Sequence, residues 1–143
     1  MAGVIFIPLQ SCSLDRFVAD CERLQSVTYL PTNASSLIRE SQSNRSASIF
    51  ASKQQLMLSK QLAQLPLVDT QLSRYRSELV TLYQHDSDLG LQVSAFMTDK
   101  GEVSVMGGSR SAFEQVAKQR ILLSRQVQDI HNYIASYCGS REF

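Results

Sequence analysis

The chain has 143 residues with a formal net charge of +1, and 43% of them are hydrophobic, which suits one domain able to bury a core. The near-neutral charge lacks the basic excess of a dedicated nucleic-acid binder, so a nucleic-acid partner is not expected. The sequence holds no apolar run long enough to span a membrane as a helix. Its polar residues are rich in Ser and Gln, which are less costly to desolvate than ions. This composition favours extensive contact with protein partners.

The N-terminal part, residues 1–31, is expected to combine an extended segment with a short helix. Pro8 lies in the first apolar run and excludes that run from the centre of a sheet. Ser13 can cap a helix that continues to about Gln25, because the apolar residues after it recur at helical spacing. The buried face of this helix should comprise Leu14, Phe17, Val18, Cys21 and Leu24.

Residues 32–52 form a Ser-rich connector with few apolar anchors, and residues 53–143 are expected to form the helical core. A helix is predicted over about 47–65, where leucines recur at helical spacing. Pro66 ends this helix, and because the residue before a proline disfavours helical geometry, the end should fall near Gln64.

The next helix is predicted to begin at an Asp69 cap and to end around His85. Asp86–Gly90 is then interpreted as a turn, because glycine tolerates a positive φ. Over about 91–106 apolar and polar residues alternate on both sides of a second turn, which predicts a β-hairpin. A lone hairpin is only marginally stable, so it should lie against the helices.

The last predicted element is a long amphipathic helix over about 112–137. Ser111 and Glu114 have the spacing of a capping box at its start, and Gly139 is suited to its end. Positions at alternating intervals of three and four residues form a heptad stripe, which we interpret as the candidate interface. The stripe comprises Phe113, Val116, Arg120, Leu123, Val127, Ile130, Ile134 and Tyr137. Burial within the chain and burial between chains are both open, and further apolar residues at 121 and 122 widen the surface.

Arg120 is the one charged member of this stripe, and two interpretations of it are open. Its long side chain can extend past the apolar surface into solvent, which is the interpretation we favour. Alternatively, it pairs with a carboxylate across a helix interface and helps to define the partner.

Few residues suit catalysis or metal binding, and none is assigned to either role. His131 and Cys138 share a helix face, but two turns separate them by about 10 Å, too far for a nucleophile–base pair. A zinc site would need Cys12 and Cys21 to join them from distant segments. No catalytic residue, cofactor or metal is therefore expected.

The cysteines number three, and an odd count at irregular spacing is not a disulfide framework. Reduced thiols in a reducing compartment are therefore expected. The segment before Cys12 matches a lipoprotein cleavage site poorly, because no basic residue precedes its apolar run, and it is interpreted as mature sequence. The predicted location is cytoplasmic or within a macromolecular assembly, without a recognisable secretion signal.

The predicted fold is mainly α: a single domain over 1–143, with three or four helices and one β-hairpin ahead of the long C-terminal helix. The favoured function is a non-enzymatic structural or assembly subunit, such as a virion or secretion-apparatus component. Its partner would be a protein, either its own copy or other subunits of a complex. The alternatives are a peptide-binding or export chaperone that holds a client polypeptide, and a nucleic-acid-associated protein.

Overall fold

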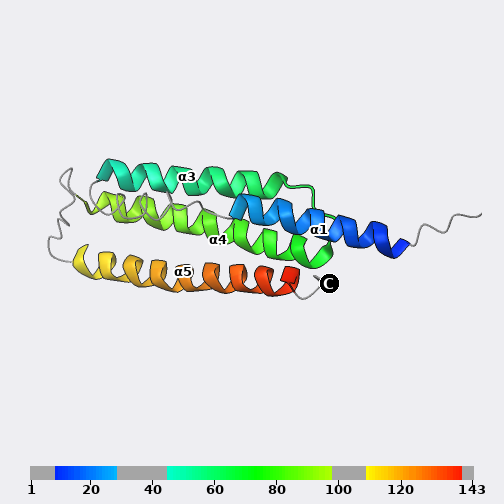
Figure 1. The fold of residues 1–143 in the computed structure, drawn as a ribbon. Helices are drawn as coiled ribbons and strands as arrows, with labels where there is room; N and C mark the ends of the chain where they lie inside the picture. The colour runs from blue at the N-terminus through cyan, green and yellow to red at the C-terminus, as the bar shows by residue number, and fades with distance from the viewer. Residues whose placement is uncertain (1–8, 29–44, 98–108, 140–143) are drawn as a thin grey trace, which may run out of the picture.

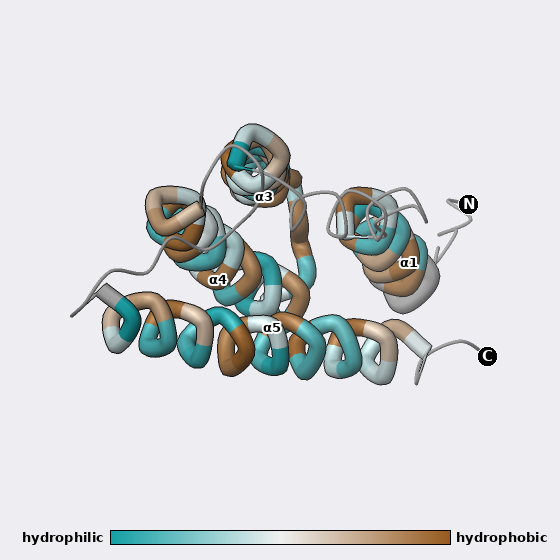
Figure 2. The backbone as a smooth tube through the Cα atoms, turned by 90° about the vertical axis from the view of Figure 1, so that its left-hand side faces the viewer, coloured by the Kyte–Doolittle hydropathy of each residue, from teal (hydrophilic) through white to brown (hydrophobic). Residues whose placement is uncertain are grey.

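Four helices make up the part of the chain that the computed structural model describes, residues 9–28, 45–97 and 109–139 (Figure 1). They are α1 (Leu9–Thr28), α3 (Arg45–Gln64), α4 (Thr70–Ala95) and α5 (Ser109–Gly139). Successive helices run in opposite directions in Figure 1, and Figure 2 shows that α5 crosses the other three obliquely. No helix within these segments is both long enough and apolar enough to cross a membrane. The mainly helical class predicted from the sequence is confirmed.

The central helix is α4, with α3 on one side of it and α5 on the other (Figures 1 and 2). α1 packs at one end of this arrangement, where it contacts all three other helices, and its N-terminal half projects beyond them. Leucines of α3 and α4 meet aromatic and aliphatic side chains of α1 and α5 in one core. The core comprises Phe17, Cys21, Leu24, Leu62, Leu72, Leu79, Tyr83, Ile130, Ile134 and Cys138.

Small residues allow α3 and α4 to approach each other closely. Ser52 and Ser87 are buried at this interface, and the Ser87 hydroxyl donates a hydrogen bond of 2.7 Å to the backbone oxygen of Ser52. Gly90 lies so near the Ser52 side chain that a Cβ atom at this position would collide with it. Gly90 therefore serves close packing inside a helix, and the predicted turn at Asp86–Gly90 is wrong.

The predicted β-hairpin over 91–106 is wrong in its first strand, because α4 continues past His85 to Ala95. Alternation over so few residues does not distinguish a strand from a helix, and here α4 continues through them with Leu89 and Ser94 buried. The rest of the predicted hairpin, 98–106, lies outside the described residues.

The boundaries of the α3–α4 connection are predicted correctly. α3 ends at Gln64, ahead of Pro66, and Asp69 caps α4 by accepting a hydrogen bond of 2.9 Å from the backbone amide of Leu72. The start of α3 lies slightly earlier than the predicted position of about 47, because Arg45 already belongs to the helix. Part of the Ser-rich connector is therefore helical, since its serines at positions 48 and 52 suit the close contact with α4.

The helices α1 and α5 are both longer than the sequence indicated. α1 continues to Thr28, and α5 begins at Ser109, so Ser111 lies inside α5. Glu114 pairs with Arg110, with 3.5 Å between Oε1 and Nε, and the predicted capping box is wrong. The C-terminal end of α5 at position 139 is confirmed.

The buried face of α1 is shorter than predicted. Phe17, Cys21 and Leu24 are buried as expected, whereas Leu14 and Val18 are exposed. Val18 is exposed although its neighbour Phe17 is buried, so the covered face of α1 is narrower than the predicted stripe.

Candidate functional site

A buried carboxylate anchors α1 to the α3–α4 connection. The Asp20 side chain is 1% exposed and accepts hydrogen bonds of 2.7 Å from the backbone amides of both Val68 and Asp69. Such charge-assisted bonds satisfy a carboxylate that would otherwise be costly to bury. Tyr137 of α5 completes the cluster by donating to the Asp69 carboxylate at 3.1 Å. Sequence reasoning missed Asp20, although an acidic residue within an apolar stripe signals buried partners.

A disulfide joins the same end of α1 to α5. Cys21 and Cys138 are bonded, with Cα atoms 6.0 Å apart. The prediction of reduced thiols is therefore wrong for these two cysteines. The disulfide could not be predicted from the sequence, because its two cysteines are 117 residues apart and only the fold brings them together. Since Cys138 carries no free thiol, it cannot act as a nucleophile with His131.

Arg120 pairs with a carboxylate of its own chain. Its Nε lies 3.2 Å from Oδ1 of Asp86 in α4, and the Gln55 amide of α3 donates a hydrogen bond to Oδ2. The predicted pairing of Arg120 with a carboxylate across a helix interface is confirmed, whereas its role in defining a partner stays a prediction. Both partners keep part of their surface exposed, so the pair contributes more to the register of α4 and α5 than to stability.

A second polar link between α4 and α5 joins Tyr83 to His131, whose hydroxyl oxygen and Nε2 lie 2.9 Å apart. Burial, with a smaller contribution from the Asp86 carboxylate, raises the pKa of Tyr83 to about 12. Burial also lowers the pKa of His131 from its ordinary value of 6.5. Both groups are thereby kept neutral at neutral pH, which suits a structural hydrogen bond.

The predicted stripe of α5 faces the rest of the same chain. Its buried members are Leu123, Ile130 and Ile134, and its other members are partly buried. Val127 and Tyr137 pack against the core, and Phe113 meets Phe96 edge to face with ring centroids 5.8 Å apart. The stripe thus has partners within the described helices, and its use as an interface with another protein stays a prediction.

The opposite face of α5 is exposed, and we call it the outward face. Ile121 and Leu122 are 56% and 58% exposed near the middle of the helix, and Tyr133 is 53% exposed closer to its end. In Figures 1 and 2, α5 forms one edge of the molecule, with the other described helices all on its inner side. The charged residues interspersed along this face include Lys118, Arg125 and Asp129. Another protein could reach the outward face without displacing any described helix.

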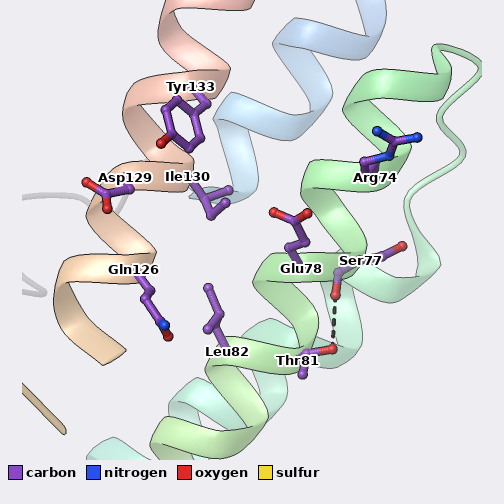
Figure 3. Close-up of a pocket in the computed structure, with 9 residues that line it drawn as sticks. All are labelled: Arg74, Ser77, Glu78, Thr81, Leu82, Gln126, Asp129, Ile130 and Tyr133. Atoms are coloured by element: carbon purple, nitrogen blue, oxygen red, sulfur yellow. Dashed lines mark hydrogen bonds between the residues drawn. The ribbon is translucent and has the colours of Figure 1, made fainter. Parts of the chain in front are cut away.

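An open groove of about 610 Å³ runs between α4 and α5 along one flank of the outward face (Figure 3). Leu82 and Ile130 supply apolar surface, and Glu78, Asp129 and Tyr133 supply polar groups. Figure 3 shows Glu78 and Leu82 extending from α4 toward α5. Ser77 and Thr81 of α4 add hydroxyl groups to this lining.

Within the residues that the structure describes, no three His, Cys, Asp or Glu side chains lie together as a metal site would require. Comparison of the chain with protein-family models, with curated proteins and with solved structures finds no match. The described part of the chain is thus a bundle of four helices in which a disulfide joins α1 to α5.

Proposed function

We propose that this protein is a non-enzymatic assembly or interaction subunit that binds a protein partner through the outward face of α5. The observation that carries the proposal is the pair Ile121 and Leu122, two adjacent large aliphatic side chains that are both more than half exposed. They lie on a helix whose opposite face already packs against its own chain. Exposed apolar groups of this kind, rimmed by polar residues, are typical of protein interaction sites.

Other helices also expose apolar side chains, but with less to support a specific contact. Leu14 and Val18 on α1 stand a turn apart, and the adjacent Leu56 and Met57 on α3 are 37% and 53% exposed, less than the pair on α5. On α5 the two aliphatic residues are adjacent and share their face with a tyrosine and an arginine, residue types that are enriched in interfaces. We therefore favour α5 as the interface.

The disulfide between Cys21 and Cys138 favours an oxidising setting for this assembly. Cytosolic thiols are kept reduced, whereas disulfides persist in secreted and periplasmic proteins and on virion surfaces. We therefore propose an oxidising compartment in place of the cytoplasmic location that the sequence indicated. A virion component and a secretion-apparatus component are both compatible with this setting.

A peptide-binding or export chaperone is the second candidate, and the groove between α4 and α5 is the observation that favours it. Glu78 and Asp129 outnumber Arg74, the basic residue of the lining, and would select a client segment that carries a basic side chain next to an apolar anchor. The two candidates differ in which change weakens binding. Glu78→Gln should weaken a groove client and leave a partner of the aliphatic pair unaffected.

Sedimentation velocity of the full chain, combined with quantitative co-purification from the native source, tests the proposed function. The double variant Ile121→Ser with Leu122→Ser should lose the association that the unchanged chain shows. Its helical circular dichroism should stay the same as that of the unchanged chain. The matched control is Leu14→Ser with Val18→Ser, which removes two exposed aliphatic residues from α1 and should preserve association. The proposal fails if the unchanged chain associates with nothing, or if both double variants associate as it does.

A further inference from the structure

We infer that the partner of the outward face is a second copy of the chain, with the two α5 helices antiparallel about a twofold axis level with Val127. The inference rests on the proposed function of this face and specifies what occupies it. It is carried by the order of charged and apolar residues along the face, which is self-complementary in the antiparallel orientation and not in the parallel one.

The charges at the middle of the outward face form the first part of this pattern. Arg125 and Asp129 lie about one turn apart, and both are exposed. In the described part of the chain neither has an ion-pair partner. They form no ion pair with each other along the helix, although Arg110 and Glu114 of α5 do pair at the same four-residue spacing. An antiparallel second copy instead brings each Arg125 opposite Asp129 of that copy, which creates two reciprocal ion pairs.

The apolar residues form the second part of the pattern. Ile121 precedes Val127 by as many residues as Tyr133 follows it, so a twofold axis there brings Ile121 level with the Tyr133 ring of the second copy. Leu122 likewise falls opposite Asn132, which is next to that ring. The exposed aliphatic pair of one copy therefore lies at the level of Asn132 and the exposed Tyr133 of the other.

The parallel arrangement lacks this complementarity. It would place Arg125 against Arg125 and Asp129 against Asp129, so that like charges oppose each other at both levels. The antiparallel arrangement opposes no like charges on this stretch of the face, since Lys118 then lies level with Ser136. Because the interface is the same on both copies, it closes on itself and yields a dimer.

The geometry of α5 permits such a contact. The helix has 31 residues, which corresponds to about 46 Å of length. The other described helices all lie on its inner side, so a second copy meets no obstruction from them (Figures 1 and 2). Gln126 and Tyr133 belong to both the face and the flanking groove, which leaves room for side chains that arrive from the second helix.

Charge exchange in the full chain tests this inference. Arg125→Asp alone opposes two carboxylates at both contacts, and Asp129→Arg alone opposes two guanidinium groups. Each single variant should raise the Kd of self-association about tenfold or more, measured by sedimentation velocity over a concentration series. The variant with both substitutions, and an equimolar mixture of the two single variants, should recover the affinity of the unchanged chain. The controls Lys53→Asp and Asp15→Arg make the same charge changes at exposed positions on α3 and α1 and should leave the Kd unchanged.

The outcomes separate this inference from the proposed function. A monomeric unchanged chain overturns the inference, as does a double variant or mixture that stays as weak as the single variants. If the double charge variant and the mixture stay as weak as the single variants while Ile121→Ser with Leu122→Ser still abolishes association, the outward face is an interface, and only the antiparallel register is wrong. Association that survives both the charge changes and the aliphatic changes refutes the proposed function as well.

Discussion

The inward and outward faces of α5 differ in how the rest of the chain contacts them. The inward face is held by directional contacts: a disulfide at Cys138, a hydrogen bond at His131 and an ion pair at Arg120. The outward face has Ile121 and Leu122 without comparable partners in the described part of the chain. The difference teaches that the main apolar stripe of a helix marks its fold, and that the apolar residues beyond the stripe mark a second surface.

Loss of the disulfide should be the largest disturbance of the inward face. Cys21→Ser with Cys138→Ser removes a link across 117 residues of sequence, and closing a loop of that size is worth about 4–5 kcal/mol in the chain-entropy model. Chemical denaturation should show this loss as a lower midpoint. Reductant should lower the midpoint of the unchanged chain similarly and have no further effect on the variant. If reductant does not change the denaturation midpoint of the unchanged chain, the assignment of this disulfide is contradicted.

An aspartate introduced first on the inward face of α5 and then on its exposed side shows how differently the two faces affect the free energy of unfolding. Val127→Asp should lower the free energy of unfolding by at least about 2 kcal/mol, because it puts an unpaired carboxylate against the core. Gln128→Asp introduces the same side chain one position further on, where it is exposed, and should change that free energy by less than about 0.5 kcal/mol. Thermal or urea unfolding measures both, and equal effects would mean that the two faces are misassigned.

The smallest expected effect is the pH dependence of the Tyr83–His131 link on the inward face. Because the folded pKa of His131 is lowered, the unfolded state binds the proton first, and the free energy of unfolding falls as pH decreases below about 6.5. The raised pKa of Tyr83 has the opposite consequence, a loss of stability as pH rises from 10 toward about 12.

Urea unfolding of the unchanged chain between pH 7 and 5.5 measures the histidine contribution. His131→Asn should flatten the slope, whereas His85→Asn, which alters an exposed histidine, should leave it as it is. If both variants keep the full slope, His131 is not held neutral by burial.

Local chemistry made several elements predictable from the sequence. Pro66 sets the end of α3, Asp69 caps α4, and the stripe of α5 identifies the face that the core covers, because each depends on residues close in sequence. The outward pair at 121 and 122 was also visible as apolar surface outside that stripe. What the pattern left open was which face the chain would cover by itself.

The features that could not be predicted depend on contacts between distant residues. Gly90 has the residue type of a turn, and only the proximity of Ser52 in α3 shows that it is required for helix packing. Likewise, the choice of Asp86 as the partner of Arg120 follows from the spacing of α4 and α5. Local preferences were outweighed by tertiary packing at these positions.

The central claim, that the outward face of α5 is the surface through which the protein assembles, can be tested residue by residue. Hydroxyl-radical footprinting with mass spectrometry should be performed on the full chain at concentrations below and above its self-association. The account predicts that Ile121, Leu122 and Tyr133 lose reactivity at high concentration, while the equally exposed Phe50 and Met57 of α3 do not. Unchanged reactivity of the three α5 residues while the chain is associated would contradict it.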